Sequence, residues 1–465
     1  MKTRAIPALI SALFVLSLAS CAIDFDPGEW IESEDLSSVS ESSSSKTSGE
    51  ISGNLKFFLD ESGESYTVAS GFIGTRTDVN IPSVYKDLPV TSIKKEGFKN
   101  TKIATLRLPD SIIEIGESAF ESCHDLREVS FGNGVMSIGD NAFFGCSKIE
   151  EIAIPDSTIA IGNNAFKSSQ AKFLSIGRNL KYIGDYAFYR CDGLKNALNL
   201  PEGLTYIGDH AFDTLRALVA YIPASVTHIG VGAFSNSLAP YRPSLEYISV
   251  DDANENYCSI DGVLYNKAQS EVVTFPTGKN PAYVRDGVSF IGDYAYYNCD
   301  HLPESFTIPE SVLKIGLEAF GHNNGIKNLT LGKNVTTIGQ SAFSQCSLEE
   351  VTLNEKLTYI PPYCFDMCLN LKSVTLPNAM KTIGEYAFKS NSYLESVTIN
   401  RSLESIGDYA FTGCYSLTEI TYLGTMDEWA NIEKGEGWIP SRQLEAVHCS
   451  DGDVGIVRQE ISSEN

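Results

Sequence analysis

The sequence predicts a repeat solenoid, in which similar coils stack on one another along the chain. One hexapeptide, in its full form Ile-Gly-x-x-Ala-Phe, recurs thirteen times between residues 93 and 411 when degenerate copies are included. Its aromatic residues lie 22 to 24 residues apart, with one gap of 62 residues between Phe234 and Tyr296. A strand-like phrase follows each copy. A unit of this length cannot bury its own aromatic ring, whereas stacked units share one continuous core.

Composition and charge limit the function classes before any motif is considered. The chain has 465 residues, of which 43% are hydrophobic and 20% charged, so it has enough apolar material for a packed core. Its 59 acidic and 35 basic side chains give a formal net charge of −24. Because an acidic surface repels phosphate backbones, we expect no nucleic acid partner.

The first element, residues 1–20, has the layout of a secretory signal peptide. Two basic residues precede an apolar run, residues 5–19, that is too short for a comfortable membrane span. The run ends in Leu18-Ala19-Ser20-Cys21, which resembles the bacterial lipobox. This resemblance implies that Cys21 is the lipid attachment point. The alternative is an ordinary signal peptide with a chance cysteine.

Two segments precede the repeats. Residues 21–50 are rich in Ser, Asp and Glu and cannot bury enough apolar surface to offset their ordering entropy, so we expect a flexible tether. In residues 51–92, the apolar residues Leu55, Phe57 and Leu59 occupy alternate positions. This alternation predicts a β-hairpin that forms an N-terminal cap over the first coil.

The repeats form two blocks, residues 93–250 and residues 286–422. The segment between them, residues 251–285, departs from the period and carries Asp261-Gly262 between two strand-like runs, which predicts an inserted β-hairpin. Residues 423–465 follow the second block and contain an aromatic cluster that includes Trp429 and Trp438. We expect a C-terminal cap and tail there, because open solenoid ends need covers.

Within each coil, the phrase after the motif predicts a half-buried strand. Polar and apolar residues alternate over the last four positions of Leu126–Phe131 and of Leu394–Ile399, as in a strand with one buried face. Several phrases close with proline, such as Pro109 and Pro377, where pairing should stop because proline has no N–H to donate. We expect the motif glycine to relax the backbone at a turn.

The combined pattern resembles a known family. The phrase Leu-x-x-Val-x-Phe/Ile, a following Pro-x-Ser-Val or its equivalent, and Ile-Gly-x-x-Ala-Phe-x-x-Cys are similar to the leucine-rich repeats of BspA-like bacterial surface proteins. The resemblance covers residues 93 to about 422. It implies a leucine-rich-repeat horseshoe with a parallel β-sheet on the concave face, and adhesion to host or neighbouring cells.

Seven of the eleven cysteines lie three residues after the motif aromatic, where other coils have Ser, Leu or Asn. A position that accepts all four residue types indicates an interior slot of the coil. The alternative is a disulfide between stacked neighbours, namely Cys123 with Cys146 or Cys346 with Cys368, at a spacing that disulfide geometry allows. The seven slot cysteines are Cys123, Cys146, Cys191, Cys299, Cys346, Cys368 and Cys414.

Chemistry at a single site is not indicated. None of the six histidines belongs to a catalytic motif, and a repeat array supplies the same residue again and again, so we expect no enzyme, cofactor or resident metal. Cys364 and Cys368 share one repeat, but no further ligand stands at metal-binding spacing. The acidic turn at residues 251–256 could coordinate Ca²⁺, although a solvated turn fits its spacing better.

The outward side of the phrase strands is the surface most suited to binding. Its middle position is a column of threonines in the second block and is more varied in the first block, where Ala153 and Ser249 also occupy it. The threonines also fit plain β-propensity, so the first block is the better candidate for a specific contact. The candidate ligand-binding residues are Arg107, Ser130, Ser175, Asn199, Tyr221, Thr307, Thr330, Thr352, Thr375, Thr398 and Thr421.

We therefore predict a monomeric, lipid-anchored protein on the outward-facing surface of a bacterial cell envelope, with the membrane as one partner through the anchor. Its solenoid would present the phrase strands to a protein or glycan ligand, since strands locked by stacking lose little entropy on binding. A nutrient-binding or polymer-binding subunit that works with a transporter or enzyme is the first alternative, and a hydrolase is the second.

Overall fold

The computed structural model describes residues 49–456, except residues 72–76, 192, 196, 215, 238–244, 300 and 440–442. The predicted signal peptide, Cys21, nearly all of the predicted tether, and the slot residue Leu215 lie outside the described residues. No helix within the described part is long and apolar enough to cross a membrane.

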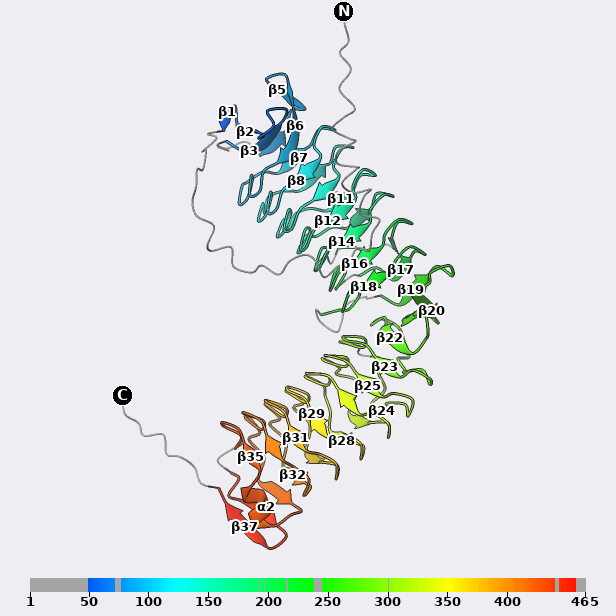
Figure 1. The fold of residues 1–465 in the computed structure, drawn as a ribbon, viewed down its shortest axis with the longest axis vertical. Helices are drawn as coiled ribbons and strands as arrows, with labels where there is room; N and C mark the ends of the chain where they lie inside the picture. Colours follow the sequence, from blue (N-terminus) through cyan, green and yellow to red (C-terminus); the bar gives the residue numbers. More distant parts are fainter. Residues whose placement is uncertain are drawn as a thin grey trace, which may run out of the picture. The chain divides into compact units, whose positions relative to one another are not determined.

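Each coil contributes two short strands, and both join parallel ladders along the array (Figure 1). The first is the motif strand, which in the complete copies of the motif ends at the isoleucine of Ile-Gly. The motif strands are β6 (Leu88–Ile93), β8 (Glu114–Ile115), β10 (Ser137–Ile138), β12 (Ala160–Ile161), β14 (Tyr182–Ile183), β16 (Tyr206–Ile207), β18 (His228–Ile229), β23 (Phe290–Ile291), β25 (Lys314–Ile315), β27 (Thr337–Ile338), β29 (Tyr359–Ile360), β31 (Thr382–Ile383), β33 (Ser405–Ile406) and β35 (Glu433–Lys434).

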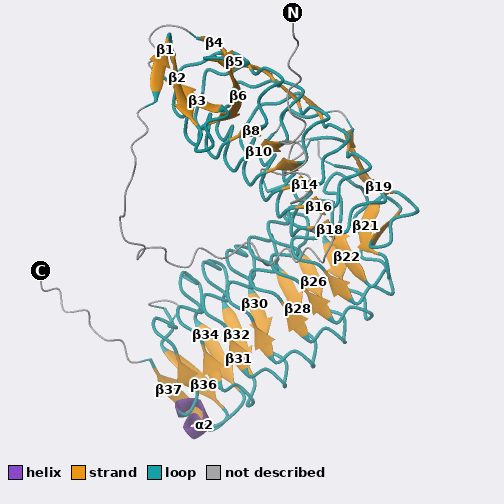
Figure 2. Ribbon diagram, turned by 45° about the horizontal axis from the view of Figure 1, so that its top comes forward, coloured by secondary structure: helices purple, strands orange, loops and turns teal. Residues whose placement is uncertain are grey.

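The second is the face strand, which corresponds to the predicted phrase (Figure 2). The face strands are β4 (Asp78–Asn80), β7 (Thr105–Arg107), β9 (Glu128–Ser130), β11 (Glu151–Ala153), β13 (Phe173–Ser175), β15 (Leu198–Asn199), β17 (Val219–Ile222), β19 (Tyr247–Val250), β24 (Ser305–Thr307), β26 (Asn328–Thr330), β28 (Glu350–Thr352), β30 (Ser373–Thr375), β32 (Ser396–Ile399), β34 (Glu419–Tyr422) and β36 (Ala446–Cys449). The parallel-stranded solenoid is thus confirmed, with a second ladder that the sequence analysis missed.

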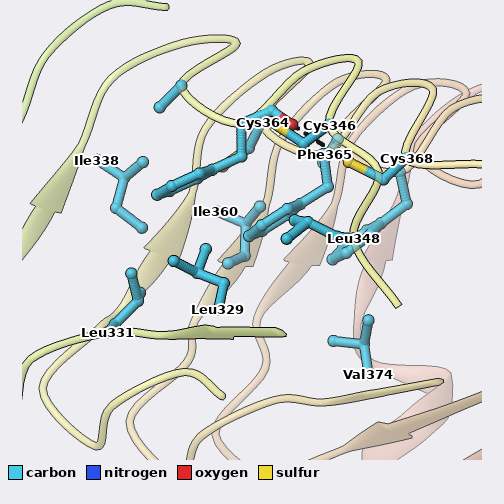
Figure 3. Packing of buried hydrophobic residues seen from close by; sticks show 14 of the residues in the cluster. Leu329, Leu331, Ile338, Cys346, Leu348, Ile360, Cys364, Phe365, Cys368 and Val374 are labelled. Carbon is cyan, nitrogen blue, oxygen red and sulfur yellow. Dashed lines mark hydrogen bonds between the residues drawn. The ribbon is translucent and has the colours of Figure 1, made fainter. Parts of the chain in front are cut away.

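The motif aromatics form the core as stacked rings, as the period predicts. In the first block the rings from Phe98 to Phe234 lie 5.1 to 5.7 Å apart between centroids and are nearly parallel. In the second block a matching stack runs from Phe275 to Phe411, with centroids 4.8 to 5.7 Å apart. Figure 3 shows Phe365 of this stack among buried aliphatic side chains such as Ile360. The prediction of one continuous core is wrong, because the buried residues divide into two clusters.

The inserted hairpin separates these two clusters. β20 (Tyr257–Ile260), β21 (Val263–Asn266) and β22 (Glu271–Thr274) pair antiparallel, and β22 then pairs parallel with β23. Successive side chains of a strand point to opposite faces. Leu264 accordingly belongs to the first core, whereas Val263 and Tyr265 belong to the second.

The hairpin has the same topology as the N-terminal cap. In that cap β1 (Glu50–Ser52), β2 (Leu55–Leu59) and β3 (Tyr66–Ser70) pair antiparallel, β3 then pairs parallel with β6, and β5 (Val84–Tyr85) pairs with β6. Phe57 at the N-terminus and Tyr265 in the hairpin each supply a buried ring ahead of the coils. The second block therefore begins on a cap of its own.

The C-terminal cap contains α2 (Met426–Ala430) and β37 (Gly452–Gly455), which pairs antiparallel with β36. The side chain of Thr425 accepts a hydrogen bond from the backbone N–H of Glu428, whose carboxylate accepts one from the N–H of Thr425. This capping box fixes the start of the short helix. Trp429 is buried and contacts Tyr422 and Trp438, so these three rings pack together.

The motif glycines have a different role from the predicted one. None of the motif glycines from Gly116 to Gly407 has a positive φ. Gly232, which does, is a second glycine in its copy and lies two residues after the motif glycine. A Cβ on Gly116 would instead lie 2.7 Å from the carbonyl oxygen of Ile93 in the preceding coil. Glycine at the motif position therefore accommodates the close approach of neighbouring coils, and no turn conformation is involved.

The left-handed residues lie elsewhere in the coil. The residue before the motif alanine and the second residue after the motif aromatic adopt positive φ in almost every coil, as Ser118 (φ 54°) and Ser122 (φ 58°) do. This alternation directs every second N–H toward the next coil, so that Ser118 donates to the carbonyl of Asp140 and Phe120 donates to that of Ala142, both at 2.8 Å. Stacking thereby satisfies the backbone of the turns.

The cysteine slot is explained by a hydrogen bond across coils. The thiol of Cys146 donates to the carbonyl oxygen of Phe120 at 3.1 Å, and that of Cys368 donates to the carbonyl oxygen of Phe343 at 3.2 Å. Where the slot holds Asn391, its amide donates to the carbonyl of Phe365 at 2.8 Å. In these coils the slot therefore holds a side chain that donates a hydrogen bond to the preceding coil. The stacked pairs considered for disulfides, Cys123 with Cys146 and Cys346 with Cys368, are free thiols.

These buried thiols predict that stability falls in alkaline solution. Burial raises the pKa of Cys346 and of Cys414 to about 12. Since the folded pKa lies above the unfolded value, the stabilisation is complete below about pH 9 and is lost as the pH rises toward 12. Each such thiol should lower the free energy of unfolding by about 1 kcal/mol per pH unit in that window.

Urea denaturation between pH 8 and pH 11 measures this effect. Replacing both thiols with serine, which another coil accepts at the same position, should make the decline with pH shallower than in the unmodified chain. Equal slopes for the two proteins would show that the buried thiols do not govern the pH dependence.

Candidate functional site

The predicted binding residues lie on the outward side of the face strands, but they do not form one site. All are exposed except Thr398 and Thr421, which are half-buried. Register brings together Arg107 with Ser130, and Asn199 with Tyr221. Ser175 pairs with Ala153. The threonines form two columns, Thr307 with Thr330 and Thr352, and Thr375 with Thr398 and Thr421.

The threonine columns lie on a uniformly polar surface. The outward residues two positions before each threonine are Ser, Asn or Glu. One position further back, acidic and basic residues alternate from coil to coil, and Lys327 forms an ion pair with Glu304 at 2.7 Å. Exposed pairs of this kind contribute little to stability, and they leave no apolar anchor for a ligand.

The first block differs, because large apolar side chains are exposed to solvent there. They belong to β13, β17 and β19 and to the residue that precedes β17. The exposed fractions are 56% for Phe173, 43% for Leu218, 46% for Tyr221 and 44% for Tyr247. Val219, which pairs in register with Tyr247, is half-buried beside them. We call these five residues the apolar patch; Val219, Tyr221 and Tyr247 lie on the paired strands β17 and β19, whereas Phe173 lies on the separate β11–β13 ladder. Contiguous exposed apolar surface on a soluble protein typically marks an interaction site.

Only Tyr221 of the apolar patch was predicted. Phe173, Val219 and Tyr247 share its outward face but occupy the other outward position of their strands, two residues earlier. The period-two alternation could have found them, had both outward positions been compared between coils. Leu218 lies just before its strand, so alternation alone gives no signal there.

Charged residues are absent from the middle of the patch. The outward positions of β13, β17 and β19 and the exposed residues Ala197 and Asn199 carry no charge. Lys172 and Glu246 lie exposed at the margin, where Lys172 pairs with Glu150 at 2.9 Å. An uncharged centre with a charged margin is the usual composition of a protein interface.

The inserted hairpin supports one end of the patch. Gly262, at φ +77°, lies so close to the ring of Tyr247 that a Cβ there would be 2.4 Å from it. The backbone N–H of Ile248 donates to the carbonyl of Gly262 at 2.9 Å, and the hydroxyl of Ser259 donates to the carbonyl of Ile248 at 2.5 Å. These contacts hold β19 and its tyrosine in place.

The acidic turn considered for Ca²⁺ has a structural role. Asn254 is fully buried, and its amide donates to the carbonyls of Pro223 and Val226 at 2.9 and 3.0 Å. Its side-chain oxygen accepts the backbone N–H groups of Asn256 and Tyr257, each at 2.8 Å. Within the described part of the chain, no group of three or more His, Cys, Asp or Glu could hold a metal ion.

Two histidine clusters were also missed, and both serve packing. His210 stacks on Tyr186, contacts Tyr294 of the second block edge-on, and pairs with the buried carboxylate of Asp213 at 3.0 Å. His228 stacks on Tyr206 at 4.5 Å, and Tyr206 stacks on Tyr182 at 4.8 Å.

Burial raises the pKa of Tyr182 to about 12 and lowers the pKa of His228. Since both faces of the Tyr206 ring are covered by its neighbours, that ring offers no face to a ligand.

Comparison with solved structures gives the same architecture. A leucine-rich cell-surface protein from Faecalibacterium prausnitzii is 24% identical, with a TM-score of 0.58 over 83% of this chain and 97% of that chain. A leucine-rich repeat protein from Eubacterium ventriosum is 22% identical, with a TM-score of 0.56 over 90% and 98% of the two chains. The pneumococcal vaccine antigen PcpA is 21% identical, with a TM-score of 0.55 over 87% and 99%. These likenesses show the fold.

Among curated proteins, no significant relative was found. The model of the BspA type leucine rich repeat region, however, matches residues 91–219 and 289–428, which together are more than half of the chain. Its two segments lie on either side of the inserted hairpin and cover both stacks of aromatic rings except Phe234 and Phe275. The chain therefore belongs to the BspA type leucine-rich repeat family, which is non-enzymatic.

Proposed function

We propose that the protein is a lipid-anchored recognition protein of the bacterial cell surface, attached through Cys21, which binds a protein or glycan ligand in adhesion or cell interaction. The observation that carries the binding role is the apolar patch, an exposed apolar area on an otherwise polar face. The location is supported by the signal-like residues 1–20 and by the solved relative from Faecalibacterium prausnitzii, which is described as a cell-surface protein.

The repeated architecture suits such a role. Strands held in register by two ladders and a stacked core lose little conformational freedom when a ligand binds. The same face continues over many coils, so that several weak contacts to one extended ligand can act together.

Protease treatment of intact cells tests the location. We expect externally added protease to remove the mature chain while a periplasmic marker remains intact, and palmitate labelling to be lost in Cys21→Ser but kept in Cys449→Ser. Survival of the chain beside a digested surface marker would instead favour a periplasmic subunit that works with a transporter or enzyme.

A further inference from the structure

We infer that Asn324 is a site of spontaneous modification, at which the side chain loses its amide nitrogen as ammonia and becomes a carboxylic acid. The residue lies in the turn between the slot residue Asn323 and β26. This turn belongs to the second block, whereas the apolar patch belongs to the first, so the modification is independent of the proposed function.

The chemistry is that of an asparagine followed by glycine. The sequence contains two such pairs, Asn133-Gly134 and Asn324-Gly325. Because glycine has no Cβ, its backbone nitrogen is open to the side chain that precedes it. After losing its proton, this nitrogen forms a bond to Cγ of the asparagine, the bond from Cγ to Nδ2 breaks, and ammonia leaves. Water then opens the resulting succinimide ring at either carbonyl carbon, which gives aspartate or isoaspartate.

In the folded chain Asn133 is held away from this reaction. Its backbone N–H and its side-chain Nδ2 both donate to Oδ1 of Asp110 in the preceding coil, at 2.8 and 3.2 Å. The following glycine is also closely packed, because a Cβ on Gly134 would clash with the carbonyl oxygen of Asp110. Hydrogen bonds to an ionised carboxylate are stronger than those between neutral groups. Turning the Asn133 side chain toward Gly134 therefore requires that such a bond be broken.

Asn324 has no comparable restraint. Its side chain is exposed, and its Oδ1 accepts one long hydrogen bond, from the hydroxyl of Ser347 at 3.4 Å. Within the described part of the chain, neither Nδ2 of Asn324 nor the backbone N–H of Gly325 donates a hydrogen bond. A donor at Oδ1 draws electrons from Cγ and leaves the departing nitrogen free. The fold thus protects one Asn-Gly pair and leaves the other open to reaction.

The turn is anchored on both sides of Asn324, so the change should remain local. Asn323 is fully buried, and its amide donates to carbonyl groups of the preceding coil and of its own coil at 2.9 and 2.7 Å. On the other side, the backbone N–H of Lys327 donates to the carbonyl of Glu304 at 2.8 Å. We expect the longer backbone of isoaspartate to bulge into solvent, and this surface to gain one negative charge.

Peptide mapping by mass spectrometry tests the inference on the full-length chain carrying Cys21→Ser. The folded protein is incubated at mildly alkaline pH in heavy-oxygen water and digested at intervals. We expect the acid product at Asn324 to form about tenfold faster than at Asn133, as both aspartate and isoaspartate, with heavy oxygen in the new carboxylate. In urea, where the fold is lost, the two sites should react at similar rates.

Two variants test the protection of Asn133. Asp110→Ala removes the acceptor and should raise the rate at Asn133 about tenfold, while the rate at Asn324 stays the same. Asp156→Ala is the matched control, because Asp156 accepts the backbone N–H of Arg178 in the same way, at 3.0 Å. It should change neither rate. Circular dichroism checks that both variants are folded.

Three results would overturn the inference. The first is an equal rate at Asn324 and Asn133 in the folded chain. The second is an acid product at Asn324 without isoaspartate, because direct hydrolysis of the amide gives aspartate alone. The third is a rate at Asn133 that does not rise in folded Asp110→Ala, which would remove the structural reason for the difference between the two sites.

Discussion

Replacing Phe343 with alanine should lower the free energy of unfolding by about 3 to 5 kcal/mol. Its ring is fully buried and is stacked between Phe320 at 5.4 Å and Phe365 at 5.7 Å. Removing it takes away the contacts of two neighbours at once and leaves a cavity in the middle of a stack, where the coils cannot collapse without breaking their ladders. Urea denaturation, followed by circular dichroism, measures the loss.

Tyr415→Ala is the matched control. This ring is 69% exposed in a nearby coil, so its removal should change the free energy of unfolding by less than about 0.5 kcal/mol. If the two variants lose equal stability, the stack of rings is not the main source of cohesion between coils.

The second large effect is expected at a motif glycine. A Cβ added to Gly339 would lie 2.4 Å from the carbonyl carbon of Gly316 and from the nitrogen of Leu317. Both atoms are backbone, so Gly339→Ala must push two coils apart and weaken the hydrogen bonds between them. We expect a loss of about 3 kcal/mol, the upper range for overpacking in a close-packed interior.

Gly455→Ala separates this steric effect from the loss of glycine itself. Nothing lies within 4 Å of a Cβ at Gly455, and its φ is not in the left-handed region. Its replacement should therefore leave the melting temperature unchanged. A Gly339→Ala variant as stable as Gly455→Ala would mean that the motif glycine is not required for stacking.

Most of the fold could be predicted because its main signal is a period. Thirteen regularly spaced aromatics require a stack, and a stack requires parallel strands. The motif strands were missed because two residues, such as Ser137–Ile138, are too few for an alternating pattern to appear. The role of Gly116 could not be derived from its own coil, because the atoms that exclude a Cβ belong to the preceding one.

The candidate site was predicted only in part, because some of its features depend on contacts between neighbouring coils. The alternating pattern along each strand indicated which face and which block to consider, and Tyr221 was identified in this way. Whether Phe173 is exposed or buried depends on what the neighbouring coils place beside it, which the pattern within its own strand does not reveal. The break in the core was visible as the gap in the period. Its cause, a strand that sends alternate side chains into two cores, required the three-dimensional pairing of β20, β21 and β22.

The inserted hairpin between the two cores also affects how the chain unfolds. Repeat proteins derive their cooperativity from contacts between adjacent units. At the hairpin the stack of rings is interrupted: β21 sends its opposite faces into the two cores, and His210 contacts Tyr294 across the two blocks. We expect this junction to be the weakest link for passing a defect from coil to coil. Pulled from both ends, the molecule should yield in two separate force steps, one for each set of coils, with the hairpin as the boundary between them.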